Sequence, residues 1–260
     1  GKTGKSFERF LNNRDIDFDI FDANIEEFYK SYDFKKYSQI LCSPGISRNV
    51  FKELTQLNDN VLTDVDIFFK EDNSTKIGIT GTNRKSTTAF HLKQLFDNYE
   101  PSSLVGNIGN TLLDNINKAK YSIIELSSFQ LDKMIENKLD YGILLNIDKD
   151  HLDYHGNFKS YKKAKEKILL AKKSISNELD PYRLFHWITG KEAKRINFEN
   201  LPYRFQNVSE HIINDSKSTN FHSLNYAIKK ANQTFGKSKY ILIVCGDPEK
   251  EDFRKIEILG

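Results

Sequence analysis

The amino-acid sequence predicts an α/β fold built around parallel β-sheets. Short apolar runs such as "KIGIT", "YSIIEL" and "DYGILLNI" alternate with longer stretches of helical pattern, which is typical of parallel α/β sheets. The string "KIGITGTNRKSTTAF", residues 76–90, places a glycine-containing turn between one such strand and a helix. The chain has 260 residues, enough for more than one domain and a sizeable core.

The amino-acid composition limits the kinds of molecule that the protein is expected to bind. Lysine and arginine number 39 against 36 acidic residues, so the excess of positive charge is small. This balance argues against a general nucleic-acid-binding protein, which would carry a concentrated basic patch. The two cysteines, Cys42 and Cys245, form no CxxC motif and are typical of reduced thiols in a cytosolic protein. The apolar runs are strand-sized and too short to span a membrane. We expect a cytoplasmic protein without nucleic-acid or membrane partners.

Three blocks follow one another along the chain. The first contains a glycine turn, "GKTGKS", and the runs "FDIFDAN" and "QILCSPGIS", each of which begins as a predicted strand. Asp22 ends the former strand and the turn Ser43 to Gly45 follows the latter, at positions where open α/β sheets bind ligands. The second block holds the strands named above, and the third holds "HIIND", a helix from about residue 220 and the strand "KYILIVCG". We expect both chain ends to be incomplete, because each outer block lacks strands that would complete its sheet.

Residues 81–87, "GTNRKST", have the chemistry of a phosphate-binding loop. Such a loop needs backbone N–H groups that point at an anion, a lysine for phosphate charge and a hydroxyl for Mg²⁺. Gly81, Lys85 and Ser86 fill these roles. Arg84 stands where the motif carries a glycine, so it either adopts a costly backbone conformation or sits in a loop of slightly different shape. Taken alone, the string is also compatible with a polar turn that binds nothing.

Two further polar residues follow predicted strands of the second block. Glu125 ends "YSIIEL", at an edge where a carboxylate can reach a magnesium ion beside the phosphates. His151 follows "ILLNI" in the string "DKDHLD". Each has an ordinary alternative, an exposed charge for Glu125 and a solvated loop histidine for His151.

The helix predicted over "NFKSYKKAKEKILLAKK" carries a lysine on its apolar side. A helical wheel collects most apolar residues on one arc, namely Phe158, Tyr161, Ala164, Ile168, Leu169 and Ala171. Lys165 falls within this arc. The opposite arc holds Lys159, Lys163, Glu166 and Lys167, together with one apolar residue, Leu170. Because a buried ammonium is costly, Lys165 needs either an ion-pair partner or a chemical role.

The order of these strings resembles that of the Mur ligases, the ATP-dependent amide-bond ligases of peptidoglycan synthesis. The resemblance is carried by "GITGTNRKST", "GNIGNTLL", "IIELSSFQL", "LNIDKDHLDYHG", "YKKAKEKI", "LPYRF" and "INDSKSTN". It spans essentially the whole chain, with "GKTGKS" and "CSPGIS" in the first block. Arg84 departs from the family's "GTNGKST". Within the family, "ELSSFQL" together with "NDSKSTN" favours the member that adds D-glutamate.

The resemblance implies a three-domain architecture and a ligase reaction. A Rossmann-like N-terminal domain (1–70) would bind a UDP substrate, a central P-loop domain (71–200) would bind ATP, and a Rossmann-like C-terminal domain (201–260) would accept the amino acid. The substrates implied are UDP-N-acetylmuramoyl-L-alanine and D-glutamate, joined through an acyl phosphate. The cofactors implied are ATP and two Mg²⁺ ions, one bound through a carbamylated Lys165. We expect a monomer.

The resemblance also implies roles for individual residues. The catalytic residues would be Lys85, Asn107, Glu125, His151 and Lys165. Magnesium would be bound by Ser86, Glu125, His151 and carbamylated Lys165. ATP would be contacted by Gly81, Thr82, Asn83, Arg84, Lys85, Ser86, Thr87, Arg204 and Asp215. The substrate would be contacted by Thr3, Asp22, Ser43, Gly45, Asn107, Ser127, Lys217, Ser218 and Thr219.

Two other functions stay open on the sequence alone. A P-loop nucleotide-binding regulator would keep residues 81–87 without ligase activity, for example if Arg84 impairs the loop. A UDP-precursor-binding protein would keep only the substrate site of the first block. The combination of Glu125, His151 and Lys165 argues against both, because a protein that only binds has little use for a second metal site.

Overall fold

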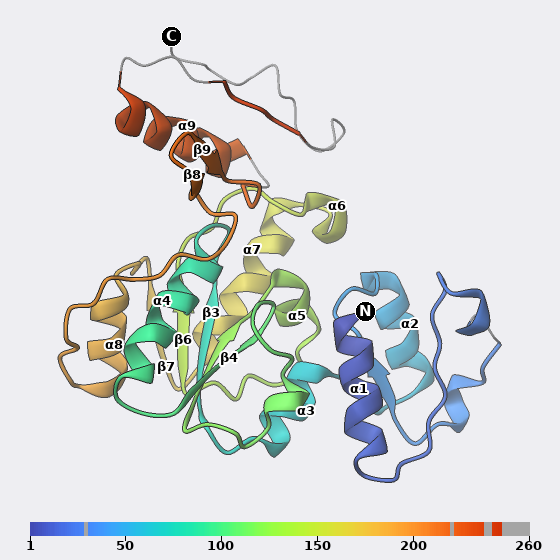
Figure 1. Ribbon diagram of the computed structural model, residues 1–260. Helices are drawn as coiled ribbons and strands as arrows, with labels where there is room; N and C mark the ends of the chain where they lie inside the picture. Colours follow the sequence, from blue (N-terminus) through green and yellow to red (C-terminus); the bar gives the residue numbers. More distant parts are fainter. Residues whose placement is uncertain (29–30, 219–220, 237–240, 246–260) are drawn as a thin grey trace. The chain divides into compact units, whose positions relative to one another are not determined.

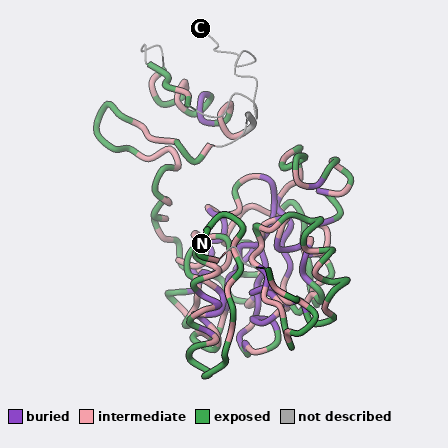
Figure 2. Tube along the Cα trace, turned by 90° about the vertical axis from the view of Figure 1, so that its right-hand side faces the viewer, coloured by how far each residue is buried: buried purple, intermediate pink, exposed green. Residues whose placement is uncertain are grey.

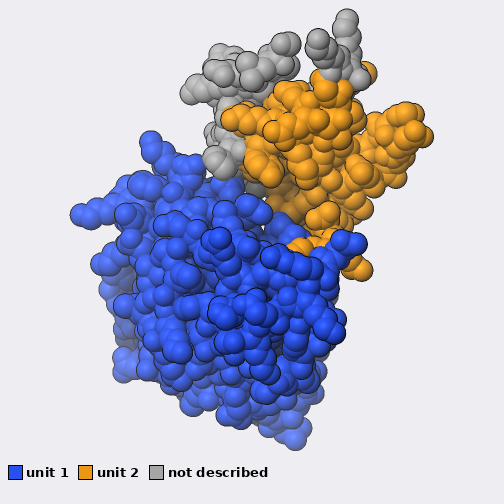
Figure 3. All heavy atoms as spheres, turned by 90° about the vertical axis from the view of Figure 1, so that its left-hand side faces the viewer, with its two compact units in different colours: residues 1–197 blue, residues 198–260 orange. Residues whose placement is uncertain are grey.

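The computed structural model describes residues 1–28, 31–218, 221–236 and 241–245 (Figure 1). The chain divides into two compact units, residues 1–197 and 198–260 (Figure 3). The first unit takes in both the predicted N-terminal and the predicted central domain, and the three-domain division with boundaries after residues 70 and 200 stays a prediction. In the described part of the chain, no helix is both long and apolar enough to cross a membrane.

A five-stranded parallel sheet forms the centre of the first unit. Its strands are β3 (Thr75–Thr80), β4 (Ser102–Gly106), β5 (Tyr121–Glu125), β6 (Tyr141–Leu144) and β7 (Lys173–Ser176). Their order is β4-β5-β3-β6-β7, and every pairing is parallel. The strands predicted in the second block are β3, β5 and β6, so the parallel α/β fold is confirmed here. Strands β4 and β7 were not predicted, because their segments "SSLVG" and "KSIS" carry few apolar residues.

Helices cover both faces of this sheet (Figure 1). On one face lie α4 (Lys85–Asp97) and α8 (Pro181–Thr189). The ring of Phe96 on α4 lies 4.7 Å from that of Tyr121 and 5.0 Å from that of Phe185, between centroids. The aromatic side chains therefore fill the space between strand β5, α4 and α8.

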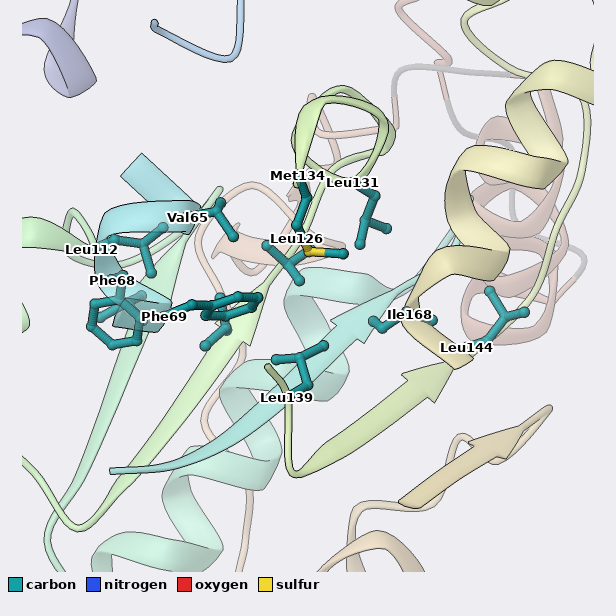
Figure 4. Packing of buried hydrophobic residues seen from close by; sticks show 12 residues of the cluster. Val65, Phe68, Phe69, Leu112, Leu126, Leu131, Met134, Leu139, Leu144 and Ile168 are labelled. Atoms are coloured by element: carbon teal, nitrogen blue, oxygen red, sulfur yellow. The ribbon is translucent and has the colours of Figure 1, made fainter. Parts of the chain in front are cut away.

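The other face is covered by α3 (Asp64–Glu71), α5 (Ser128–Lys133), α7 (Phe158–Glu166) and the 3₁₀ helix η4 (Lys167–Leu170). Their apolar side chains form one core with the strands (Figure 4), namely Val65, Phe68, Phe69, Val105, Leu112, Ile124, Leu126, Leu131, Met134, Leu139, Leu144 and Ile168. Figure 2 shows buried residues concentrated in this unit. Gly142 of β6 permits η4 to approach closely, because a Cβ there would lie 2.1 Å from the carbonyl oxygen of Ile168. That contact seats the end of α7 on the sheet.

The strand order creates a topological switch point at β3. From β3 the chain passes through α4 to β4 on one side, and from β5 it passes through α5 to β6 on the other side of β3. Right-handed crossovers in opposite directions put these two helices on opposite faces. In open α/β sheets, the carboxyl ends of the strands at a switch point are where ligands bind. The predicted phosphate loop follows β3 at this edge.

The first 63 residues contain a separate two-stranded parallel sheet. Their elements are α1 (Lys2–Asn12), η1 (Glu26–Phe28), η2 (Phe34–Lys36), β1 (Ile40–Cys42), α2 (Arg48–Leu57) and β2 (Val61–Thr63). The strand predicted over "FDIFDAN" is wrong, since residues 18–24 form no strand. Instead of entering a sheet, Phe21 packs edge-on against Tyr32 and Phe34. Phe7 and Phe10 of α1 pack against Ile67 and Leu113, the latter on η3 (Leu113–Asn115).

In the second unit, β8 (Gln206–Ser209) and β9 (Ile212–Asn214) form an antiparallel pair, and α9 (Phe221–Phe235) follows. The strand at "HIIND" and the helix from about residue 220 are therefore confirmed. The strand predicted at "KYILIVCG" is absent over residues 241–245, the part of that string which the structure describes. Ile241 and Ile243 are 90% and 82% exposed, so these apolar side chains do not pack as a central strand would.

Candidate active site

The phosphate loop lies at the carboxyl end of β3. The side chain of Asn146 hydrogen-bonds to the backbone of this loop. Asn83 donates its N–H to Oδ1 of Asn146 over 2.8 Å, and Nδ2 of Asn146 donates to the Asn83 carbonyl over 3.0 Å. Oγ1 of Thr82 accepts the N–H of Asp148 over 2.8 Å and lies 2.9 Å from the hydroxyl of Tyr161. Asn146 was not among the predicted site residues, although its place two residues after β6 is a signal of the kind that indicated other strand-end residues.

Arg84 has a left-handed backbone, with φ 66° and ψ 4°, and is the N-cap of α4. Of the two alternatives for this residue, the structure has the costly backbone conformation. A left-handed non-glycine residue costs about 1–2 kcal/mol. The loop therefore keeps the backbone course that a glycine would give, at the cost of local strain.

Lys85 and Ser86 begin α4, where the N-terminus of a helix favours anions. Nζ of Lys85 donates to the carbonyl oxygen of Thr82 over 2.9 Å, so the side chain folds back over the loop. Ser86 is buried and Thr87 is half-buried. Residues 81–87 thus have the strand–loop–helix arrangement that phosphate binding requires, and their contacts with ATP stay a prediction.

Glu125 lies beside the loop, with its carboxylate buried. It ends β5 in register with Ile79 of β3 and is 1% exposed, so the alternative of an exposed charge is wrong. Its Oε1 accepts from Nδ2 of Asn107 over 2.8 Å, and its buried Oε2 has no hydrogen-bond partner among the described residues. Gly106 permits the approach of Asn107, because a Cβ there would lie 2.4 Å from the Glu125 carbonyl oxygen. A buried carboxylate oxygen left open beside a phosphate loop fits a cation ligand.

Lys165 points inward, as the helical wheel predicts, and is 2% exposed. Its Nζ donates to the carbonyl oxygen of Gly81 over 2.7 Å and to Oγ1 of Thr80 over 3.3 Å. Both acceptors are neutral, and no carboxylate among the described residues forms an ion pair with this amine. The alternative of a buried ion pair is therefore wrong.

The surroundings of Lys165 also change its protonation. Burial, followed by the positive charge of Lys85, holds the pKa of the Lys165 amine well below its usual range, against the charges of Asp150 and Glu125. A lowered pKa raises the share of neutral amine at neutral pH. The neutral amine is the nucleophilic form, so Lys165 is suited to react as well as to bind.

His151 is the N-cap of α6 (Leu152–His155) and has a left-handed backbone with φ 48°. Its ring centroid lies 4.9 Å from that of Phe129 and 6.5 Å from that of Tyr161. In the described part of the chain, no three His, Cys, Asp or Glu side chains lie close enough to hold a metal ion. The roles of His151 and Glu125 as magnesium ligands stay predictions.

The predicted substrate contacts of the first unit are distributed over several elements. Ser127 is the N-cap of α5, and its Oγ accepts the N–H of Gln130 over 3.2 Å. Ser43 and Gly45 follow β1 as predicted, and Thr3 lies in the first turn of α1. Asp22 does not end a strand. Its Oδ1 accepts the N–H of Asn24 over 2.9 Å in a local turn.

A basic cavity of about 450 Å³ lies between α1 and the segment that follows β4. It is lined by Lys2, Lys5, Arg9, Gly109, Asn110, Thr111, Asp114, Asn115 and Lys118. Asp114 pairs with Arg9. Basic side chains therefore dominate the cavity, which suits an anionic ligand.

In the second unit, the predicted nucleotide residues lie close together. Oδ1 of Asp215 accepts the N–H of Phe205, the residue after Arg204, over 2.7 Å, and Oδ2 accepts from the hydroxyl of Ser218. The N–H of Lys217 donates to the carbonyl of Tyr203 over 3.1 Å. Thr219 lies outside the described residues. The roles of these residues stay predictions.

Comparisons with known proteins identify the family. Residues 79–239 match the Mur ligase middle domain. The chain is 42% identical over 193 residues to the UDP-N-acetylmuramoylalanine--D-glutamate ligase of Francisella tularensis subsp. novicida (strain U112). The matched segment covers 70% of this chain and 44% of that protein. It is 40% identical over 199 residues to the enzyme of the same name from F. tularensis subsp. tularensis (strain WY96-3418). Here the matched segment covers 72% of this chain and 46% of that protein. The chain thus spans less than half the length of these relatives.

Among solved structures, the chain is similar to a pseudomurein peptide ligase type C from Methanothermus fervidus. The identity is 21% and the TM-score is 0.36, with 67% of this chain and 42% of that chain covered. The match to the Mur ligase middle domain covers more than half of the chain. This protein belongs to the Mur ligase family, whose middle domain binds ATP.

Proposed function

We propose that this protein is an ATP-dependent ligase that joins D-glutamate to UDP-N-acetylmuramoyl-L-alanine through an acyl phosphate. The observation that carries the proposal is the amine of Lys165, which is buried against the phosphate loop and donates to neutral acceptors among the described residues. A loop that only bound a nucleotide would gain nothing from a buried lysine at this place. The identity to D-glutamate ligases of Francisella supports the choice of substrates.

The reaction needs an activated carboxylate, because oxide is a very poor leaving group. Transfer of the γ-phosphoryl group from ATP to the substrate carboxylate breaks the bond to ADP and forms the acyl phosphate. The amino group of D-glutamate then attacks the acyl carbon, phosphate leaves, and the nitrogen loses a proton as the amide forms. Catalysis of this kind works mainly through positioning and stabilisation of charge.

The phosphate loop supplies most of the groups that ATP would need. The phosphates would lie against the N–H groups at the start of α4, with the ammonium of Lys85 turned toward the β- and γ-phosphates. Oε2 of Glu125 and the hydroxyl of Ser86 would bind Mg²⁺, which offsets charge on the phosphates. The remaining predicted ATP contacts are Gly81, Thr82, Asn83, Arg84, Thr87, Arg204 and Asp215.

Lys165 would act as a carbamate. The neutral amine attacks CO₂, a C–N bond forms, and one proton leaves, so that a cation-forming side chain becomes an anion. The new carboxylate would lie where the amine now meets Gly81, and together with His151 it would supply ligands for a second Mg²⁺. The conversion also removes the cost of burying an ammonium.

The diphosphate end of the UDP-linked substrate would lie in the basic cavity beside α1. Lys2, Lys5 and Lys118 there suit its diphosphate. The segment that lines this cavity at residues 109–111 also carries Asn107, which contacts Glu125, so one loop links the cavity to the reacting end. The other contacts proposed in this unit are Thr3, Asp22, Ser43, Gly45 and Ser127. We also propose that the protein acts as a monomer in the cytoplasm.

A nucleotide-binding regulator and a UDP-precursor-binding protein are the competing functions. Phosphate release from ATP by the intact protein separates the three. We expect release to require UDP-N-acetylmuramoyl-L-alanine and D-glutamate together, with L-glutamate as the matched control that gives little release. Hydrolysis that ignores both substrates would favour the regulator, and binding of the UDP precursor without turnover would favour the binding protein.

A further inference from the structure

Lys133 ends α5 and joins segments that are distant in the sequence. Its Nζ donates to the carbonyl oxygen of Pro44 over 2.7 Å and to the hydroxyl oxygen of Tyr154 over 2.5 Å. Pro44 belongs to the turn of residues 43–45 after β1, and Tyr154 belongs to α6. Lys133 is 3% exposed. One buried amine therefore contacts both the predicted substrate turn and the helix that begins after His151.

The ammonium of Lys133 is held by neutral groups. Among the described residues it forms no ion pair, and the neighbouring Asp132 is paired with Arg48 over 2.9 Å. Burial raises the pKa of the Tyr154 phenol to about 12, so this acceptor is uncharged at neutral pH. The Tyr154 ring adds a cation–π contact, with its centroid 4.7 Å from Nζ. Burial lowers the pKa of Lys133 itself to about 8.

A buried cation among neutral groups is a costly way to hold segments together. Apolar side chains in the same place would pack with a smaller desolvation cost. What the amine adds is direction, because hydrogen bonds to one carbonyl and one hydroxyl hold the turn and α6 at a defined separation. The contact therefore specifies position more than it stabilises the fold.

The position so specified extends to His151. Phe129 of α5 packs edge-on against Tyr154, with 4.4 Å between ring centroids, and lies 4.9 Å from the ring of His151. Lys133 and Phe129, one turn apart on the same helix, thus contact α6 together. A shift of the turn at Pro44 would move Tyr154 through Lys133, and with it the start of α6.

We propose that Lys133 is a positioning residue that holds the turn of residues 43–45 and the start of α6 in one arrangement, so that the UDP-linked substrate can contact the turn while its reacting end lies near His151. The inference rests on the proposed function, because it requires this substrate to contact the turn. Without the amine, the turn and α6 lose their shared anchor, which weakens substrate binding and leaves the phosphate loop unchanged.

The test is Lys133→Met in the intact protein, with calorimetry for UDP-N-acetylmuramoyl-L-alanine and, separately, for ATP. We expect the Kd of the UDP-linked substrate to rise about tenfold and the Kd of ATP to stay within twofold. Lys167→Met is the matched control, because Nζ of Lys167 donates to the carbonyls of Asp132 and Met134 at the same helix end without reaching the turn or α6. This control should bind both ligands like the wild-type protein.

Tyr154→Phe provides a second route, since it removes the hydroxyl and keeps the ring. We expect its effect on the Kd of the UDP-linked substrate to be smaller than that of Lys133→Met, and the double variant to bind no more weakly than Lys133→Met alone. Unchanged substrate binding in Lys133→Met, or an equal loss in Lys167→Met, would overturn this inference alone. If Lys133→Met did not fold, unchanged binding in Tyr154→Phe would do the same. Absence of binding by the wild-type protein would instead overturn the proposed function, and this inference with it.

Discussion

Nζ of Lys165 lies 2.7 Å from the carbonyl oxygen of Gly81, the first residue of the phosphate loop. One turn earlier on α7, the hydroxyl of Tyr161 lies 2.9 Å from Oγ1 of Thr82 in the same loop. Helix α7 therefore contacts the loop along one side through two consecutive turns. A group attached to the Lys165 amine would lie next to the loop, at the place where the proposed phosphoryl transfer occurs.

Lys165→Ala should nearly abolish ligation, by on the order of 10³-fold or more, because it removes the proposed metal-binding carbamate. Formate at high concentration should restore part of the rate, since it supplies a carboxylate in the vacated space. Turnover with and without formate measures both effects. Lys163→Ala, on the exposed side of the same helix, is the control and should keep the wild-type rate. Near-normal turnover of Lys165→Ala would show that the carbamate role is wrong.

Lys85→Ala should weaken the use of ATP far more than the binding of the UDP-linked substrate. Lys85 lies on the phosphate loop, whereas the basic cavity lies between α1 and residues 109–118. Loss of one phosphate contact should reduce the rate on the order of 10²-fold. Calorimetry with each ligand tests this, with Lys93→Ala farther along α4 as the control. An equal loss of affinity for both ligands would contradict the separation of the two sites.

Local patterns in the sequence predicted the parts of the site that depend on local structure. The alternation of strand and helix located β3, the loop and α4, and helical periodicity located the buried side of α7, including Lys165. The strand predicted at Asp22 failed because an alternating pattern does not supply a neighbouring strand to pair with.

Contacts between segments that are distant in the sequence produce no local sequence pattern, so they could not be predicted in this way. Asn146 braces Asn83 from the end of another strand, and nothing within either segment indicates that pairing. Helix α5 has six residues, which is too short for a clear periodicity. Lys133 was therefore not among the predicted site residues, and its contacts with Pro44 and Tyr154 follow only from the fold.

Asp64 should make the stability of the protein depend on pH. Burial raises the pKa of its carboxyl from 3.8 to about 6, with the N–H of Val65 opposing the shift. Between these values the folded state binds more protons than the unfolded state, so the free energy of unfolding falls as pH rises from about 4 to above 6. Asp64→Asn should remove this loss and stabilise the protein at pH 7 by on the order of 2–3 kcal/mol.

Urea denaturation of Asp64→Asn at pH 7 and at pH 4 measures this effect. The gain over the wild-type protein should be present at pH 7 and nearly absent at pH 4, where the wild-type carboxyl is also protonated in the folded state. Asp59→Asn, at an exposed position, should change the free energy of unfolding little at either pH. A gain of equal size at both pH values would show that the carboxyl charge is not its cause.

Arg84→Gly should stabilise the folded protein and leave the rate of ligation within about tenfold of wild type, roughly 1.4 kcal/mol in activation free energy. The backbone of Arg84 is left-handed, with φ 66°, and glycine adopts this conformation without the steric cost of a side chain. Because glycine also loses more backbone entropy on folding, the net gain in unfolding free energy should be about 0.5–1 kcal/mol.

Arg84→Ala separates the effect of the backbone from that of the charge, since alanine keeps the strained φ and loses the guanidinium. It should be no more stable than the wild-type protein. Both variants keep the loop N–H groups and Lys85, so both should still ligate. A rise in turnover far beyond tenfold in Arg84→Gly alone would mean that the natural arginine impairs the loop, as a nucleotide-binding regulator would require.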